Sequence, residues 1–194
     1  VDMHEYIDKL ETVKLTEEQK ELAKQDPTTL IPEELRFAYK SVHAKVRWPV
    51  SHVMPIYSYR VSRASQKSRD HLTYEDVELL NDIVEDIRAS VSEHGCKLSF
   101  VAQGLDETNI CVLTSFDAGF AKEEHLKSQS GFVTIITSQD ITEEAQYCNI
   151  CEFQSSTISR RVRSTLAAES ASLSIALDRH VFARLLVQAF IYGE

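Results

Sequence analysis

The spacing of apolar residues changes near Gly95, and this change limits the folds that the chain can adopt. Before Gly95 the apolar residues recur at steps of three and four, as they do along one face of a helix. After Gly95 come short segments rich in β-branched and aromatic residues, which is typical of strands. A helical pattern then returns from Ser164 to the C-terminus. The order predicts an α+β fold with two domains, residues 1–95 and residues 96–194.

Helix boundaries in the first half are marked by capping residues and prolines. Thr16 and Gln19 have capping-box spacing and predict the start of a short helix. Pro32 predicts the first turn of a second helix. Pro49 and Pro55 are expected to bracket a break in the helical pattern, with a third helix starting at Pro55. The second helix is expected to bury one apolar face, formed by Leu35, Tyr39, Val42 and Val46.

The clearest helix follows Thr73, which precedes Asp76 by capping-box spacing. It is expected to end at Gly95 and to bury an apolar stripe formed by Val77, Leu80, Val84, Ile87 and Val91. Four strands are predicted beyond it, over Leu98–Val101, Ile110–Phe116, Phe132–Thr137 and Ile150–Ser156. The final helix carries a long apolar ridge that includes Leu166, Leu173, Leu177, Val181, Leu185 and Leu186.

Composition excludes several classes of protein. A hydrophobic fraction of 43% with 26% charged residues is typical of a globular chain. The net charge of −9 argues against a general nucleic-acid coat, which needs a basic surface. No apolar run approaches the roughly 20 residues of a membrane span, so no membrane partner is expected. Neither an initiator Met nor a signal peptide is present at Val1, which favours a processed product or an excised fragment. The protein is expected to be intracellular, in a compartment that the sequence does not specify.

Two carboxylates stand out by their positions. Asp117 ends an apolar strand and is followed by Ala118 and Gly119, whose small size lets a ligand approach. Glu169 lies among small residues in the first turns of the last helix. If the two converge, they offer the oxygen ligands that Mg²⁺ prefers. The alternative is that both are solvated surface acids, as most of the 30 acidic residues must be.

The other candidate groups also admit two interpretations each. Cys148 and Cys151 form a C-x-x-C pair, which is either redox-active or half a zinc site, or else two reduced, part-buried thiols. Trp48, Tyr57 and Tyr59 could stack on bases, but at helical spacing they are also typical of core or interface positions. The seven histidines show no paired spacing, so a histidine metal site is not expected.

Three motifs resemble the ribonuclease H domain of copia-type retrotransposon polyproteins. Residues 115–121, S-F-D-A-G-F-A, resemble that family's first-strand motif S-D-A-x-(W/F). Residues 128–132, S-Q-S-G-F, resemble the entry to its second strand, and residues 161–169, R-V-R-S-T-L-A-A-E, resemble its first helix. The motifs occur in the family's order. More loosely, residues 4–11 and 61–65 resemble the reverse transcriptase connection segment that precedes this domain.

The resemblance implies a domain that cleaves the RNA strand of an RNA–DNA hybrid with two Mg²⁺ ions. In that family Asp117 would correspond to the first catalytic metal ligand and Glu169 to the second. Later acids, on a strand after this helix, complete the family's site, and the sequence stops at Glu194 before such a strand. The resemblance therefore predicts a truncated ribonuclease-H-like domain, a small and mostly antiparallel sheet with one long helix, that is inactive alone.

The chain departs from the family in its third strand, where a W-S-S-K-K-Q motif is replaced by F-Q-S-S-T-I at residues 153–158. The lost lysines would contact phosphates in the family. Arg160, Arg161 and Arg163 form a basic cluster nearby. This cluster is interpreted either as a nucleic-acid-binding, phosphate-contacting element or as a solubilising loop.

Two functions follow from these observations. One is an enzyme fragment that needs the remainder of a ribonuclease H domain. The other is a domesticated, non-catalytic scaffolding or interaction subunit of a larger assembly. In both, the apolar surface of the last helix is wider than one face of a small sheet can cover. A protein partner, or the missing remainder of the domain, is therefore expected to cover it.

Overall fold

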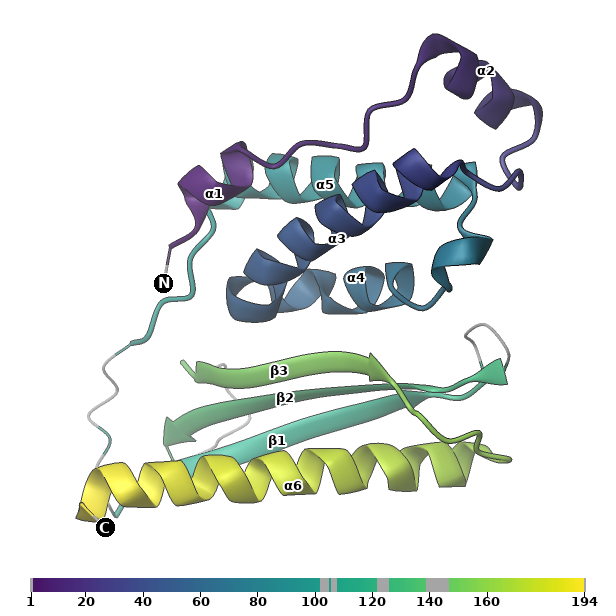
Figure 1. The fold of residues 1–194 in the computed structure, drawn as a ribbon. Coiled ribbons are helices and arrows are strands. Elements are labelled where there is room, and N and C mark those ends of the chain that lie inside the picture. Colours follow the sequence, from purple (N-terminus) through teal and green to yellow (C-terminus); the bar gives the residue numbers. More distant parts are fainter. Residues whose placement is uncertain (1, 102–104, 106–107, 122–125, 139–146, 194) are drawn as a thin grey trace. The chain divides into compact units, whose positions relative to one another are not determined.

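The computed structural model describes residues 2–101, 105, 108–121, 126–138 and 147–193 (Figure 1). The chain divides into two compact units, residues 1–97 and residues 98–194. The first unit is helical among its described residues, and the second combines an antiparallel sheet with one long helix. The predicted α+β class is confirmed at this level.

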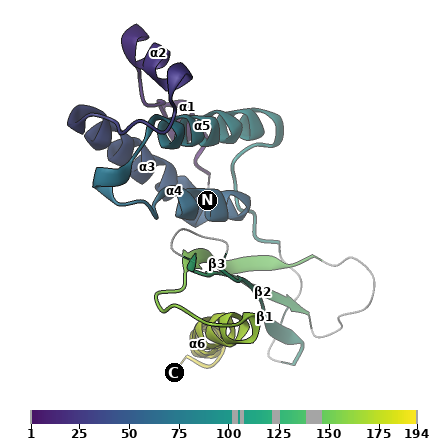
Figure 2. The same cartoon turned by 90° about the vertical axis from the view of Figure 1, so that its right-hand side faces the viewer.

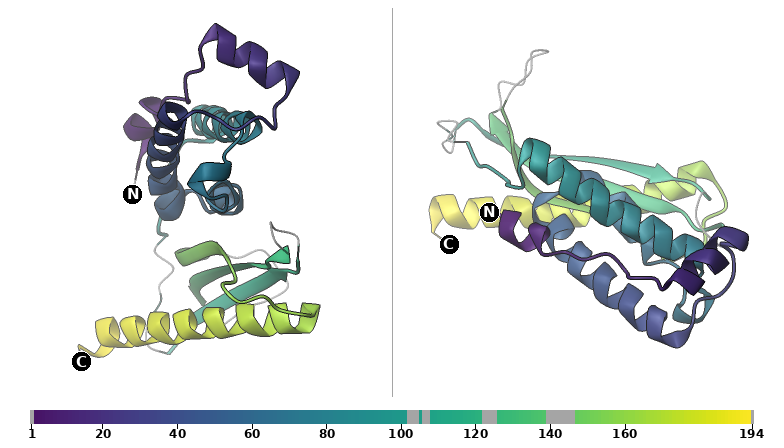
Figure 3. Two further views of the ribbon diagram at one scale, coloured as in Figure 1. Left: turned by 45° about the vertical axis from the view of Figure 1, so that its right-hand side comes forward. Right: turned by 90° about the horizontal axis from the view of Figure 1, so that it is seen from above.

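The core of the first unit forms around one helix, α5, which packs against α1, α3 and α4 (Figure 3). Its predicted stripe is buried, with every member at most 1% exposed. Ile83 joins that stripe and is also fully buried. The helical elements of this unit are α1 (His4–Asp8), α2 (Glu17–Gln25), α3 (Glu33–Val53), η1 (Pro55–Tyr57), α4 (Ser58–Ala64), η2 (Arg69–His71) and α5 (Tyr74–His94).

Both predicted capping boxes are confirmed. The Thr16 hydroxyl accepts from the Gln19 backbone N–H at 3.3 Å, and the Gln19 side chain accepts from the Thr16 N–H at 2.9 Å. At α5 the Asp76 carboxylate accepts from the Thr73 N–H and hydroxyl, each at 2.9 Å. Each box satisfies backbone donors that the first turn of a helix leaves unpaired.

The predicted break at Pro49 is wrong, because α3 continues through Pro49 to Val53. Proline has no N–H, so the carbonyl of Lys45, four residues earlier, loses its helical partner. The hydroxyl of Tyr6 donates to that carbonyl at 3.1 Å and takes the place of the missing N–H. The helix ends instead before Pro55, with Met54 outside the helical region, as the residue preceding a proline tends to be.

The second unit contains the strands β1 (Ile110–Gly119), β2 (Gln129–Ser138) and β3 (Asn149–Thr157) in the order β1-β2-β3, all antiparallel. The helix α6 (Thr165–Tyr192) runs along one face of this sheet (Figure 2). The strand predicted over Leu98–Val101 is wrong, since those residues pair with no strand. The Asn149 side chain accepts from the N–H of Val101 at 2.8 Å and donates to the carbonyl of Val101 at 3.0 Å. These are the two backbone groups that a neighbouring strand would otherwise bond.

The fully buried part of the α6 face that packs on β1 and β2 consists of small residues. Ala168 and Ser172 are fully buried there and Ala176 is 2% exposed. Their spacing of four places them on one face of the helix and lets it lie close to the sheet. Most of the large apolar side chains of α6 are instead exposed, apart from the half-buried Ile175 and Val187. The exposed ones are Leu166, Leu173, Leu177, Val181, Phe182, Leu185, Leu186, Phe190, Ile191 and Tyr192.

Candidate metal site

Asp117 lies in β1, opposite Gly131 of β2, and its side chain is exposed. One carboxylate oxygen, Oδ1, accepts a hydrogen bond from the N–H of Ala118 at 2.8 Å. The remaining lone pairs have no hydrogen-bond donor within the described part of the chain. The carboxylate is therefore open to solvent and to a cation.

Glu169 lies in the second turn of α6 and is half-buried. The helix begins there because Ser164 caps it, with its hydroxyl accepting from the N–H of Ala167 at 3.1 Å. No ion pair involves Glu169 within the described residues. Neighbouring Ala168 is fully buried against the sheet, so Glu169 lies at the border of the buried face.

Two hydrogen bonds fix the position of α6 along β1. The Ser172 hydroxyl donates to the backbone carbonyl of Asp117 at 2.8 Å, and the Thr114 hydroxyl lies 3.2 Å from Nδ1 of His180. The helix and the strand therefore run in opposite directions. Glu169 precedes Ser172 by about 4.5 Å along the helix axis. The structure thus brings the backbones of Asp117 and Glu169 to the same end of the sheet.

Alternation along β1 does not point the side chain of Asp117 toward α6, the helix that carries Glu169. Thr114 and its partner Thr134 face α6, since their hydroxyls meet at 2.9 Å and Thr114 also meets His180. Successive side chains of a strand point to opposite faces, so Asp117, three residues after Thr114, points away from α6. Glu169 can approach it only around the outer edge of β1. No described strand pairs with that edge.

Asp117 and Glu169 lie at the same end of the sheet, but the Asp117 carboxylate points away from the helix that carries Glu169. Among the described residues there is no group of three or more His, Cys, Asp or Glu side chains that could hold a metal. Mg²⁺ is commonly bound by one or two carboxylates and keeps several waters. A two-metal reaction centre needs more ligands than these two acids supply.

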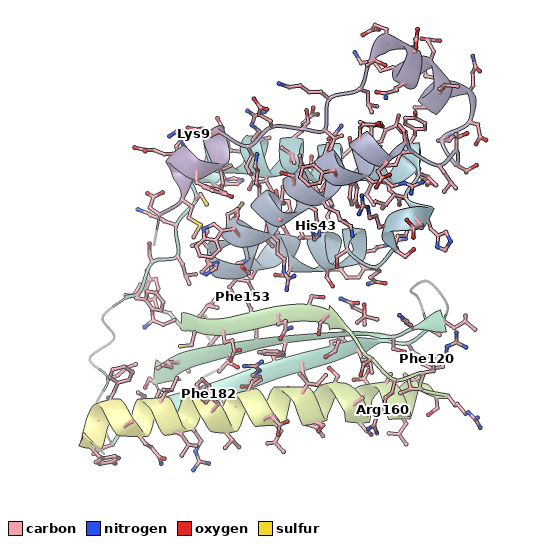
Figure 4. All side chains as sticks on the ribbon, in the orientation of Figure 1. Lys9, His43, Phe120, Phe153, Arg160 and Phe182 are labelled. Atoms are coloured by element: carbon pink, nitrogen blue, oxygen red, sulfur yellow. The ribbon has the colours of Figure 1, made fainter. Side chains whose placement is uncertain are left out.

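The three arginines of the basic cluster lie in the connection between β3 and α6, and all are exposed. Figure 4 shows Arg160 at the end of the unit where α6 begins, which is also the end that carries Phe120. Within the described part of the chain, Arg160, Arg161 and Arg163 form neither ion pairs nor side-chain hydrogen bonds. They are therefore free to contact an anion at the end of the sheet that carries both acids.

Of the remaining candidates, the two cysteines lie in the second unit and the aromatic residues lie in the first. Cys148 and Cys151 are free, exposed thiols, and Cys151 donates to the carbonyl of Asn149 at 3.6 Å. In the first unit, the hydroxyl of Tyr57 donates to the carbonyl of Asp86 at 3.1 Å. Trp48 stacks obliquely on His52, with ring centroids 4.2 Å apart, and remains 53% exposed.

Sequence reasoning missed the buried polar contacts between α6 and the sheet. Ser130 and Ser172 are at most 2% exposed, and their hydroxyls lie 2.8 Å apart. Thr134 is fully buried under the same helix. The only sign of these contacts in the sequence is Ser172, which lies between Ala168 and Ala176 at steps of four. A hydroxyl that is buried on such a face requires a hydrogen-bond partner.

Comparison with models of protein families, with curated proteins and with solved structures finds no match to this chain. No helix in the described ranges is both long and apolar enough to span a bilayer.

Proposed function

We propose that residues 98–194 form the first part of a ribonuclease-H-like unit, in which Asp117 and Glu169 supply two ligands to a divalent cation at the outer edge of β1. The further ligands would be water and acids from another segment or chain. The RNA–DNA hybrid is the substrate that the copia-type resemblance implies. The phosphates of the hybrid would be contacted by Arg160, Arg161 and Arg163.

The observation that carries this proposal is the hydrogen bond from Ser172 to the carbonyl of Asp117. It holds the start of α6 against the end of β1, and the two motif acids lie within one helical turn of that contact. The order of elements, a three-stranded antiparallel meander followed by a long helix, agrees with the resembled family. The open edge of β1 leaves room for a further strand bearing further acids.

Cation binding tests the proposal. We expect Mn²⁺ to broaden the NMR signals of Asp117, Ala118 and Glu169, because a paramagnetic ion relaxes nuclei close to it. Asp117→Asn and Glu169→Gln should each abolish this effect. Asp178→Asn is the matched control, since Asp178 is an exposed acid further along the same helix. Broadening that persists in either variant, or that vanishes equally in the control, would contradict the proposal.

Hybrid cleavage tests the expectation of inactivity. The 194-residue chain should not cleave an RNA–DNA hybrid with Mg²⁺ or Mn²⁺, because two carboxylates cannot fix two metals in the geometry of in-line hydrolysis. Metal-dependent cleavage that disappears in Asp117→Asn would show that the site is complete and that this expectation is mistaken.

A second candidate function, protein binding by a non-catalytic subunit, is favoured by the exposed apolar side chains of α6. Phe190 is 88% exposed and Leu166 is 76% exposed. Apolar surface in water costs about 25 cal/mol per Å², so a partner that covered several such side chains would gain several kcal/mol. Sedimentation as a monomer that binds no hydrophobic dye would contradict this function.

A further inference from the structure

The segment from Leu35 to Arg69 differs in charge from the rest of the chain. It contains eight lysine and arginine residues and neither aspartate nor glutamate, although acids outnumber bases by 30 to 21 in the whole sequence. Four of the eight are paired with acids outside the segment, in the ion pairs Arg36–Asp70, Arg60–Asp86, Lys67–Asp76 and Arg69–Glu33.

Three of the other basic residues, Lys40, Lys45 and Arg47, lie on α3 and are exposed. Their side chains form no hydrogen bond or ion pair within the described residues. The acids of α3 itself, Glu33 and Glu34, are confined to its first turn. The remaining length of this helix therefore presents positive charge to solvent.

Two aromatic side chains share the outer face of α3 with these cations. Phe37 is 73% exposed and Trp48 is 53% exposed. They are eleven residues apart, about three turns or 16 Å along the axis, and so lie on the same side of the helix. Ala44 lies between them and is also exposed. The opposite side of α3, with Tyr39 and Val46, is buried in the first unit.

We infer that this outer face of α3 binds a single strand of nucleic acid. The rings of Phe37 and Trp48 would stack on bases, while Lys40, Lys45 and Arg47 would contact the phosphates on either side. Aromatic rings placed among cations match such a strand, because every base has a flat face and every linkage carries a charge. A duplex hides its base faces, and an acidic peptide offers no partner for two separated rings.

This surface is formed by residues of α3 alone. Because the chain as a whole carries a net charge of −9, it attracts phosphates only close to these cations. Salt screens this attraction. The logarithm of the binding constant should fall with that of salt concentration by about 0.7 per phosphate contacted. Replacing three cations should reduce this slope by about two.

Trp48 makes the test direct, because it is the only tryptophan in the chain. We expect an oligothymidylate of about 20 nucleotides to quench its fluorescence at low salt, and a blunt duplex of the same length to quench it much less. Quenching by the duplex and the single strand alike, or stronger quenching by oligoglutamate than by the oligonucleotide, would overturn the inference.

Matched variants locate the surface. The triple change Lys40→Glu, Lys45→Glu and Arg47→Glu should abolish binding of a labelled oligonucleotide, measured by anisotropy. The control triple Lys9→Glu, Lys20→Glu and Lys24→Glu alters the net charge equally and should bind far more tightly than the α3 triple. Equal losses in the two triples would contradict the surface.

A further pair of variants tests stacking without reversing charge. Phe37→Leu and Trp48→Leu keep an apolar side chain and should each weaken binding roughly tenfold, since base–aromatic stacking is lost. Circular dichroism melting checks that each variant is folded. Unchanged affinity in both folded variants would contradict the stacking role.

Discussion

The two long helices α5 and α6 carry apolar residues at similar spacing but use them in opposite ways. In α5 the large residues are the buried ones, and the stripe from Val77 to Val91 forms the core of the first unit. In α6 the buried residues are Ala168, Ser172 and Ala176, and most of the large apolar residues are exposed. An apolar stripe shows that a helix has something to bury. It does not show whether the same chain buries it.

The largest difference should appear when one leucine is shortened in each helix. Leu80→Ala should cost the first unit about 2–5 kcal/mol of unfolding free energy, because Leu80 is fully buried and its loss leaves a cavity. Leu177→Ala should cost the second unit less than about 0.5 kcal/mol, because Leu177 is 54% exposed. Trp48 fluorescence reports the first unit in a denaturant titration, and circular dichroism follows both.

A comparable cost for the two leucines would break the comparison. It would mean that the exposed residues of α6 are covered in solution, for instance by a second copy of the chain. Repeating the Leu177→Ala titration over a range of protein concentrations would distinguish that case, since the stability of an associated state depends on concentration.

Enlarging an alanine in α6 should separate its two faces. Ala168→Leu should destabilise the second unit by about 1–3 kcal/mol, because Ala168 is fully buried between helix and sheet. Ala189→Leu makes the same chemical change at an exposed position of the same helix and should be nearly neutral. Thermal melting of the two variants measures the difference, and equal melting temperatures would show that α6 does not pack closely on the sheet.

The features predicted correctly from the sequence are local. Thr16 with Gln19 and Thr73 with Asp76 act over three residues, and the stripe of α5 repeats over single turns. The two mistaken elements depend on distant side chains. Tyr6 sustains α3 near Pro49 by bonding the carbonyl of Lys45, 39 residues away, and Asn149 bonds the backbone of Val101, 48 residues away.

The candidate site shows the same limit. The positions of Asp117 on a strand and of Glu169 on a helix follow from local pattern and from the resemblance. The sheet face to which Asp117 points cannot be predicted in this way, because a shift of one residue in register moves a side chain to the other face. Nor could the sequence show that Ser172 would reach the carbonyl of Asp117, since that contact depends on how α6 packs on β1.

The contact that sustains α3 should have a moderate effect. Tyr6→Phe should cost the first unit roughly 0.5–1.5 kcal/mol, because the Lys45 carbonyl loses its donor. In the Pro49→Ala background residue 49 regains an N–H that can serve this carbonyl, so Tyr6→Phe should cost less there. Trp48 fluorescence in denaturant measures all four members of this cycle. Equal costs in the two backgrounds would show that Tyr6 does not replace the missing N–H.

The smallest expected effect is a pH dependence confined to the first unit. His43 lies on α3 (Figure 4), and its Nε2 is 2.9 Å from the carbonyl of Val61 in α4. Burial lowers the pKa of His43 below its usual 6.5, and Arg47 lowers it further, while the bond to Val61 opposes them. As the pH falls, the unfolded chain therefore takes up the proton on His43 before the folded chain does. The folded state should be most stable above pH 6.5 and should lose stability below that pH, until the pH passes the lowered pKa of the folded state. His43→Gln should remove this part of the pH dependence, as measured by Trp48 fluorescence in denaturant at several pH values. His43 should give no such pH dependence to the unfolding of the second unit. If the first unit became more stable on acidification through this range, the neutral, buried state of His43 would be contradicted.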